Sequence, residues 1–339
     1  MKNSYETITV SPVMPWTFVL RRLHSVLGFF LVFFLFEHLL TNSQGAFLFG
    51  ADGKGFIDGV NLIHSLPYLP VIELALIAVP FLIHGIWGVI YTLTSSPNCY
   101  PTDGSRPALY FSRNHAYTWQ RITALLLIFG VVAHVMHMRM NEYPRYAKVG
   151  SQNHYMVKIS MDEGLYTLAP RLNVSLFDRK SIDELESSLL PTLKSQQMNE
   201  RNHSLHANRP LRTLDPALAH TLSERTLAEE KLEWVRLLSS RYLGRRQVIA
   251  SAPDFGTACL LTVRDAFKSI PLAILYSLFV IVAVFHAMNG VWTFAITWGV
   301  TLTERSRVGA RHVTSALMFL LIFLGLGAIW GCYWINLKN

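Results

Sequence analysis

Five long apolar stretches constrain this 339-residue chain more than any other feature of its sequence. A helix needs about 20 mostly apolar residues to cross the hydrocarbon core of a bilayer. The stretches that meet this requirement are residues 23–40, 71–93, 119–138, 270–294 and 313–335. Charged residues make up only 15% of the chain, against about 25% in an ordinary soluble protein. The sequence therefore predicts an all-α, five-helix bundle that is integral to a membrane.

A long polar segment interrupts this series. Residues 141–268 separate the third stretch from the fourth and far exceed an ordinary connection. We therefore expect transmembrane helices one to three in 1–140, an insertion in 141–268, and helices four and five in 269–339. Inside the insertion, Asp215 followed by Pro216 is typical of a helix start, and 218–243 has amphipathic helical spacing. With a shorter helix over 181–190, the insertion is expected to be partly helical.

Basic residues at the ends of the apolar stretches predict the topology. Short cytoplasmic loops of membrane proteins carry an excess of Lys and Arg. Arg21 and Arg22 precede the first stretch, and Arg305 lies in the short loop between the fourth and fifth. This places the N-terminus in the cytoplasm and, three crossings later, the insertion outside the cell membrane. No basic stripe with interleaved aromatic residues is present, so we expect no nucleic-acid partner.

Four histidines lie deep inside four different apolar stretches. They are His38, His84, His134 and His286. An ionisable side chain at membrane depth is costly and usually functional. Any one of them alone fits a hydrogen-bonded packing role equally well. As a set, however, they favour haem binding, because neutral imidazole is a common axial ligand of haem iron and four suffice for two haems.

The depth of these histidines along their helices predicts how they pair. At a rise of about 1.5 Å per residue, His38 and His134 lie about 24 and 20 Å above the inner edge of the membrane. His84 and His286 lie about 15 and 16 Å above it by the same measure. We therefore expect an outer pair, His38 with His134, and an inner pair, His84 with His286. Two haems at these depths would carry electrons across the membrane.

A fifth histidine competes for the outer site. His137 follows His134 by three residues and lies on nearly the same face of the predicted helix. It is also one turn closer to the outer interface, where water can hydrate it. We therefore favour His134 as the ligand and keep His137 as the alternative.

Several short motifs resemble those of a known family. Arg-Arg-Leu-His-Ser at 21–25 opens the first stretch, and Gln-Arg-Ile-Thr at 120–123 opens the third. The most specific block combines Asn-Gly-Val-Trp at 289–292 with Phe-Ala-Ile-Thr-Trp-Gly at 294–299. In this order the motifs are similar to those of the five-helix, two-haem cytochrome b subunits that anchor succinate:quinone oxidoreductases and fumarate reductases. The resemblance covers all five stretches but not 141–268, where the family has only a short connection.

The resemblance implies a membrane-anchor subunit that passes electrons between an iron–sulfur subunit and membrane quinone through two bis-histidine b haems. It also implies a flavoprotein subunit that handles succinate and fumarate, and a quinone of the menaquinone type. The histidine pairs that it implies are the same two pairs. The chain itself has no dinucleotide-binding or CxxC motif, so we do not expect it to oxidise succinate alone.

Two carboxylates fall within the stretches, Glu37 beside His38 and Glu73 at the outer end of the second stretch. Glu73 is a candidate for proton exchange with quinone, and a merely hydrated interfacial carboxylate is the alternative. At the inner edge, Arg21, Arg22 and Arg305 are candidates for pairing with haem propionates or with the iron–sulfur subunit. The topology rule alone accounts for these arginines equally well.

Two other functions stay open at this point. The first is the dihaem cytochrome subunit of a hydrogenase, formate dehydrogenase or nitrate reductase, which the block at 289–299 makes less favourable. The second is a transporter that relays protons through membrane histidines. The sequence has no inverted repeat and no pair of helices broken by Gly or Pro, which argues against the transporter.

Overall fold

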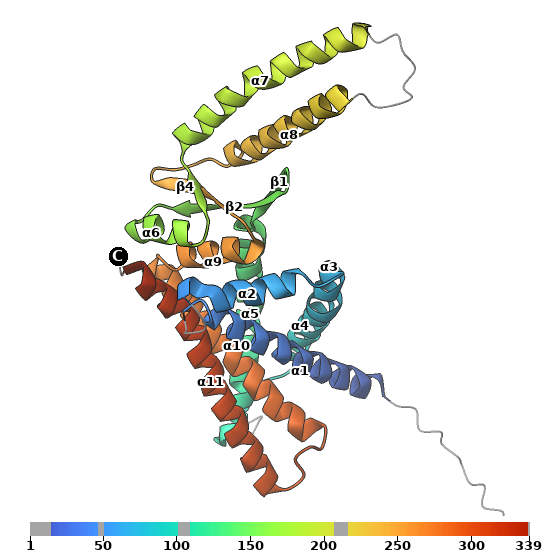
Figure 1. The fold of residues 1–339 in the computed structure, drawn as a ribbon. Helices are drawn as coiled ribbons and strands as arrows, with labels where there is room; N and C mark the ends of the chain where they lie inside the picture. The colour runs from blue at the N-terminus through green and yellow to red at the C-terminus, as the bar shows by residue number, and fades with distance from the viewer. Residues whose placement is uncertain (1–14, 47–50, 101–108, 207–215, 338–339) are drawn as a thin grey trace, which may run out of the picture. The chain divides into compact units, whose positions relative to one another are not determined.

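The computed structural model describes residues 15–46, 51–100, 109–206 and 216–337 (Figure 1). Five of its helical segments are long and apolar enough to cross a membrane. They are Trp16–Ser43, Leu69–Leu93, Ser112–Asn141, Ile270–Thr297 and Glu304–Tyr333. The prediction of five membrane-length helices is therefore confirmed. Most of the helices begin before the apolar stretch, since the helix continues into polar residues at its ends.

Two of the five crossings contain a wider π-helical turn. The first crossing is α1 (Trp16–Ser43). The second crossing, which contains one of these turns, runs through α3 (Leu69–Glu73), η2 (Leu74–Ala78) and α4 (Val79–Leu93). The third joins α5 (Ser112–His134) to η3 (Val135–Asn141), and the last two are α10 (Ile270–Thr297) and α11 (Glu304–Leu337). The π-helical segments η2 and η3 begin directly after Glu73 and His134. Such turns are frequent at functional sites.

Local sequence accounts for the sharp reversal between α10 and α11. Gly299 has a left-handed φ of 71°, which costs a residue without a Cβ atom little. The amide of Val300 then donates to the Ala295 carbonyl at 2.9 Å, which closes the end of α10. At the start of α11, the Thr303 hydroxyl accepts from the Ser306 amide at 3.1 Å. These two caps fix the loop that belongs to the most specific motif of the sequence.

The chain forms two compact units. The first comprises 1–37, 70–128 and 282–320, and the second comprises 38–69, 129–281 and 321–339. The first unit holds His84 and His286, and the second holds His38 and His134. In the second unit, η1 (Ala51–Gly53) and α2 (Lys54–His64) precede the second crossing. Each predicted histidine pair thus lies within one unit.

A four-stranded antiparallel sheet inside the insertion corrects the all-α prediction. Its strands are β1 (Arg145–Val149), β2 (Gln152–Ser160), β3 (Ser175–Phe177) and β4 (Gln247–Ala252), in the order β1-β2-β4-β3. The strands were missed because β3 is three residues long and β4 follows it only after two long helices. The signal that was available is the Gly150–Ser151 pair, a two-residue turn typical of a β-hairpin.

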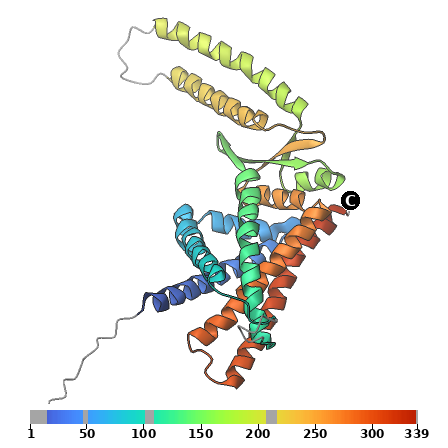
Figure 2. The same cartoon turned by 180° about the vertical axis from the view of Figure 1, so that it is seen from behind.

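Four helices accompany the sheet. They are α6 (Glu163–Arg171), α7 (Arg179–His206), α8 (Pro216–Ser239) and α9 (Phe255–Ala266). The predicted helices at 181–190 and 218–243 correspond to α7 and α8, although α8 ends at Ser239. Asp215, the predicted cap of α8, lies outside the described residues. The antiparallel α7–α8 pair projects from the sheet (Figures 1 and 2).

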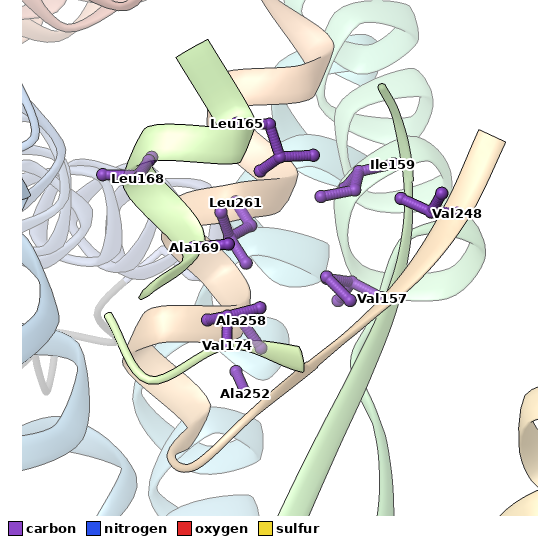
Figure 3. Close-up of a cluster of buried hydrophobic side chains, with 11 residues drawn as sticks. Val157, Ile159, Leu165, Leu168, Ala169, Val174, Val248, Ala252, Ala258 and Leu261 are labelled. Carbon is purple, nitrogen blue, oxygen red and sulfur yellow. The ribbon is translucent and has the colours of Figure 1, made fainter. Parts of the chain in front are cut away.

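The two faces of the sheet bury two separate cores. On β2, Val157 and Ile159 face α6 and α9 in a cluster with Leu165 and Leu261 (Figure 3). Met156, directly before Val157 on the same strand, instead joins a cluster that includes side chains of α7 and α8. Because successive strand residues point to opposite faces, one strand serves both cores. The insertion therefore has the layers that a folded domain needs.

Asp162 connects the start of α6 to the end of α9. Its carboxylate accepts from the Leu165 amide at 2.9 Å and from both terminal nitrogens of Arg264 at 2.7 and 2.8 Å. Lys268 completes the site at 2.6 Å. Burial on its own would raise the pKa of Asp162, but the hydrogen bonds and charges of Arg264 and Lys268 outweigh it and hold this pKa below its usual value. The Arg264 side chain is only 7% exposed, so it depends on this partner.

We predict that Asp162→Asn lowers the free energy of unfolding of the insertion by about 3 kcal/mol, because it keeps the helix cap but leaves a buried guanidinium without its charge partner. Thermal unfolding and protease cleavage of the purified chain measure this. The stabilisation by Asp162 is present at neutral pH and is lost as the pH falls below about 4, the unfolded pKa, towards the lower folded pKa. The Asp162→Asn variant lacks this part of the acid sensitivity.

Asp178 provides the matched control for that variant. It caps α7 by accepting from the Ser181 amide at 2.8 Å, and its carboxylate is exposed. Asp178→Asn should change stability by less than about 0.5 kcal/mol, since asparagine caps a helix equally well. Equal losses in the two variants would contradict the role of the buried ion pair.

Candidate functional site

The histidine pair predicted to be the inner one lies in the first unit. The imidazole of His84 on α4 and that of His286 on α10 have ring centroids 6.3 Å apart and planes at 89°. A metal–imidazole bond is about 2 Å long, so two imidazoles on one metal ion have centroids about 6 Å apart. The spacing of this pair therefore fits one metal ion between the rings.

Hydrogen bonds assign the ring protons of this pair. Nδ1 of His84 lies 2.9 Å from the carbonyl oxygen of His24, which only accepts, so this nitrogen carries the proton. Nδ1 of His286 lies 3.2 Å from the Thr123 hydroxyl, which itself donates to the Trp119 carbonyl at 2.7 Å. The Thr123 oxygen is thus an acceptor for His286. In both rings the lone pair is left on Nε2, as a metal ligand requires.

His24 belongs to this site and was missed as a site residue by the sequence analysis. Its ring stacks on His84 with centroids 4.0 Å apart and planes 5° apart. Among the described residues, its buried Nδ1 has no hydrogen-bond partner. Gly28, one turn further along α1, allows this close approach, since a Cβ atom there would lie 2.5 Å from Cε1 of His84. The sequence feature that could have identified His24 is its position in the motif at 21–25.

A polar network fixes the height of His286 on α10. Gln120 on α5 donates to the carbonyl of His286 at 3.0 Å, and Asn289 donates to the side-chain oxygen of Gln120 at 2.7 Å. In an apolar bundle such paired groups favour one register of the two helices, because any other register leaves them unsatisfied. The short motifs at 120–123 and 289–292 thus meet in space.

The histidine pair predicted to be the outer one lies in the second unit. The rings of His38 on α1 and His134 on α5 have centroids 5.8 Å apart and planes at 82°. The hydroxyl of Tyr276 lies 3.4 Å from Nδ1 of His134 and 2.9 Å from Nδ1 of His137. The structure thus brings His134 against His38, and it holds His137 against a tyrosine.

The remaining predicted site residues have different surroundings. Arg22 donates to the carbonyl of Thr297 at the end of α10, and its guanidinium lies 5.1 Å from the centre of the Trp298 ring. A cation at a helix C-terminus stabilises the helix dipole. Arg21 and Arg305 are exposed. Arg22 is therefore already bound by the protein, which favours a structural role for it.

The two predicted carboxylates, Glu73 and Glu37, lie on the second and first crossings. Glu73 is half-buried at the last residue of α3, directly before the π-helical segment η2. Glu37 is exposed on α1 beside His38. Within the part of the chain that the structure describes, no three His, Cys, Asp or Glu side chains converge as metal ligands. A metal group held by two histidines would have to bring its other ligands with it, as a porphyrin does.

Comparison with known proteins gives one distant relative. The chain is 22% identical to the succinate dehydrogenase cytochrome b558 subunit of Bacillus subtilis (strain 168) over 314 residues, which cover 92% of this chain and 95% of the relative. No family model and no solved structure matches. This similarity supports, at a distance, the family resemblance that the motifs indicate.

We predict that Gly28→Ala lowers the stability of the bundle by about 1–3 kcal/mol, because the added methyl group overlaps the His84 ring and the helices must separate. The midpoint of thermal unfolding in detergent measures this. Gly309→Ala on α11 is the control, since a Cβ atom there meets nothing within 4 Å. It should be neutral or stabilising by up to about 1 kcal/mol. Equal behaviour of the two variants would contradict the close approach at Gly28.

Proposed function

We propose that this chain is the membrane-anchor cytochrome b subunit of a succinate dehydrogenase or fumarate reductase. One observation carries the proposal: two pairs of histidines face each other at the spacing of bis-imidazole metal sites. In the inner pair, both Nδ1 atoms are engaged by acceptors and both Nε2 atoms keep their lone pairs. The similarity to a succinate dehydrogenase cytochrome subunit supports the same reading.

In this proposal each pair holds one haem b, His84 with His286 and His38 with His134. Haem iron, when bound, would supply a centre that takes up and releases one electron. The protein's own contribution is orientation: the His24 carbonyl and Thr123 engage Nδ1 of the inner rings, which leaves the lone pair on Nε2, the atom that would bind the iron. Electrons would pass between an iron–sulfur subunit, itself joined to a flavoprotein, and membrane quinone, which we take to be menaquinone.

We further propose that the N-terminus lies in the cytoplasm of a multi-pass cell-membrane protein, so that the insertion faces outward. The arginines before α1 and α11 support this orientation. It makes the His84–His286 pair the one nearer the soluble subunits. Protease added to intact spheroplasts should cut within 141–268. Cleavage only in inverted vesicles would reverse the inner and outer assignments.

The other functions are less well supported. A cytochrome subunit of a hydrogenase or formate dehydrogenase would also hold two haems, but the relative belongs to a succinate dehydrogenase. A proton-relay transporter would not require histidine rings in facing pairs with assigned protons. Co-purification of a flavoprotein and an iron–sulfur protein distinguishes the first alternative, and a haem spectrum distinguishes the second.

We predict that the purified complex contains two low-spin b haems and that histidine substitutions act in pairs. His84→Ala and His286→Ala should remove one component of the reduced-minus-oxidised spectrum, because each ligand completes the same site. His38→Ala and His134→Ala should remove the other component. Loss of a common component in His84→Ala and His38→Ala would overturn the pairing.

His137→Ala is the matched control for these variants, since His137 lies three residues from His134 on the same crossing. It should retain both haems. Loss of the outer haem in His137→Ala, with retention in His134→Ala, would show that His137 is the ligand and His134 is not. A complex without any haem would refute the proposed function itself.

We propose that Glu73 exchanges protons with quinone on the outer side. It is half-buried at the end of α3, and a carboxyl group near the interface is less costly than one at mid-membrane. Glu73→Gln keeps the size and polarity of the side chain but cannot release a proton. General acid–base catalysis contributes about 10²-fold or more to a rate, so quinone-linked turnover should fall at least about tenfold. Both haem spectra, and succinate oxidation with an artificial acceptor, should stay unchanged. Normal quinone turnover would favour a hydrated carboxylate.

A further inference from the structure

The hydroxyl of Tyr276 contacts two neighbouring histidines of the third crossing, and nothing in the sequence analysis assigns it a role. We propose that Tyr276 is the positioning residue of the outer site: its oxygen accepts from Nδ1 of His134, and its proton goes to Nδ1 of His137. This leaves His134 with a lone pair on Nε2, the atom that would bind the metal, and leaves His137 with a proton there. The inference rests on the proposed function, because it concerns the group that the His38–His134 pair would hold.

The first step follows from the single proton that the Tyr276 hydroxyl can share between the two histidine rings. A phenol hydroxyl has one proton, so it cannot donate to both rings. A neutral ring that accepts at Nδ1 carries its own proton on Nε2 and cannot bind a metal there. The shorter contact, 2.9 Å, is the one to His137, against 3.4 Å for His134. Donation to His137 leaves His134 as the ring with a protonated Nδ1 and a lone pair on Nε2.

The second step is the identity of the ring that lies beside His38. The ring that this count leaves able to bind a metal, His134, is also the one packed against His38 at 5.8 Å. The inner site follows the same plan, since the Thr123 hydroxyl of α5 accepts from Nδ1 of His286 on α10. In the outer site the roles of the two helices are exchanged, with the hydroxyl on α10 and the imidazole on α5. Metal-bound histidines almost always donate their second ring N–H in this way.

Close packing holds Tyr276 in place. Its ring lies edge-on to Phe267 at 5.4 Å and to Phe279 at 6.3 Å. Phe279 in turn lies over Gly130, where a Cβ atom would come within 2.6 Å of the Phe279 ring. Gly130 precedes His134 by one helical turn, so one seam between α5 and α10 presents both the glycine and the histidine. The phenol is therefore fixed on both sides, as a positioning group must be.

The test is Tyr276→Phe in the complete complex, which removes the hydroxyl and keeps the ring. We expect the midpoint potential of the outer haem to become more positive, because a His134 ring without a hydrogen-bond acceptor is a less basic ligand for oxidised iron. Transfer of the outer haem to apomyoglobin should become about tenfold faster or more, because loss of a group that orients a metal ligand typically weakens metal binding by about that factor. The inner haem should keep its potential and its electron paramagnetic resonance signal, which also reports that the bundle is folded.

Tyr333→Phe on α11 is the matched control, since the ring of Tyr333 packs against Trp330 in the same unit. It should leave both haems unchanged. An outer haem with the same potential and release rate in Tyr276→Phe and in Tyr333→Phe would overturn the inference while the proposed function stands. An outer haem that is retained in His134→Ala and lost in His137→Ala would also overturn it. A complex that binds no haem in its natural sequence fails at the proposed function instead.

Discussion

The hydrogen bonds at Nδ1 of the buried imidazoles are the constraint on which the rest of the bundle depends. A buried ring nitrogen without a hydrogen bond is costly, and at three of these imidazoles a neighbouring helix supplies a partner for Nδ1. The partners are a backbone carbonyl of α1 for His84, a threonine of α5 for His286 and a tyrosine of α10 for His134. Because each partner lies on another helix, helix register and ring orientation are fixed together.

Small residues complete this arrangement at the points where a ring meets a helix. Gly28 lies against His84, and Gly130 lies against the phenylalanine that supports Tyr276. In a membrane, helices associate through close packing and polar contacts and gain little from the hydrophobic effect, so these contacts have a large influence on stability. The same residues thus serve the fold and the candidate site. A site built on packed helices is also more rigid than one built on loops.

The insertion follows different physics from the bundle. Its sheet separates two apolar cores, and the buried ion pair of Asp162 with Arg264 joins α6 to α9. Burial of apolar surface against water, which drives the folding of soluble domains, provides its stability. It adds a folded extracytoplasmic domain, in the proposed topology, to a bundle of the resembled type.

The sequence by itself determined the five crossings and the four deep histidines, because bilayer thickness fixes the length of an apolar helix and because ionisable residues are rare at that depth. Helical rise was sufficient to predict which histidines meet, since both members of a pair are measured from the same membrane edge. The tertiary structure alone decided the stack of His24 on His84, the contacts of the Tyr276 hydroxyl with both His134 and His137, and the four-stranded sheet. Each of these depends on contacts between residues far apart in the chain, such as the pairing of β2 with β4, and hydrophobic periodicity within one segment carries no information about its partner.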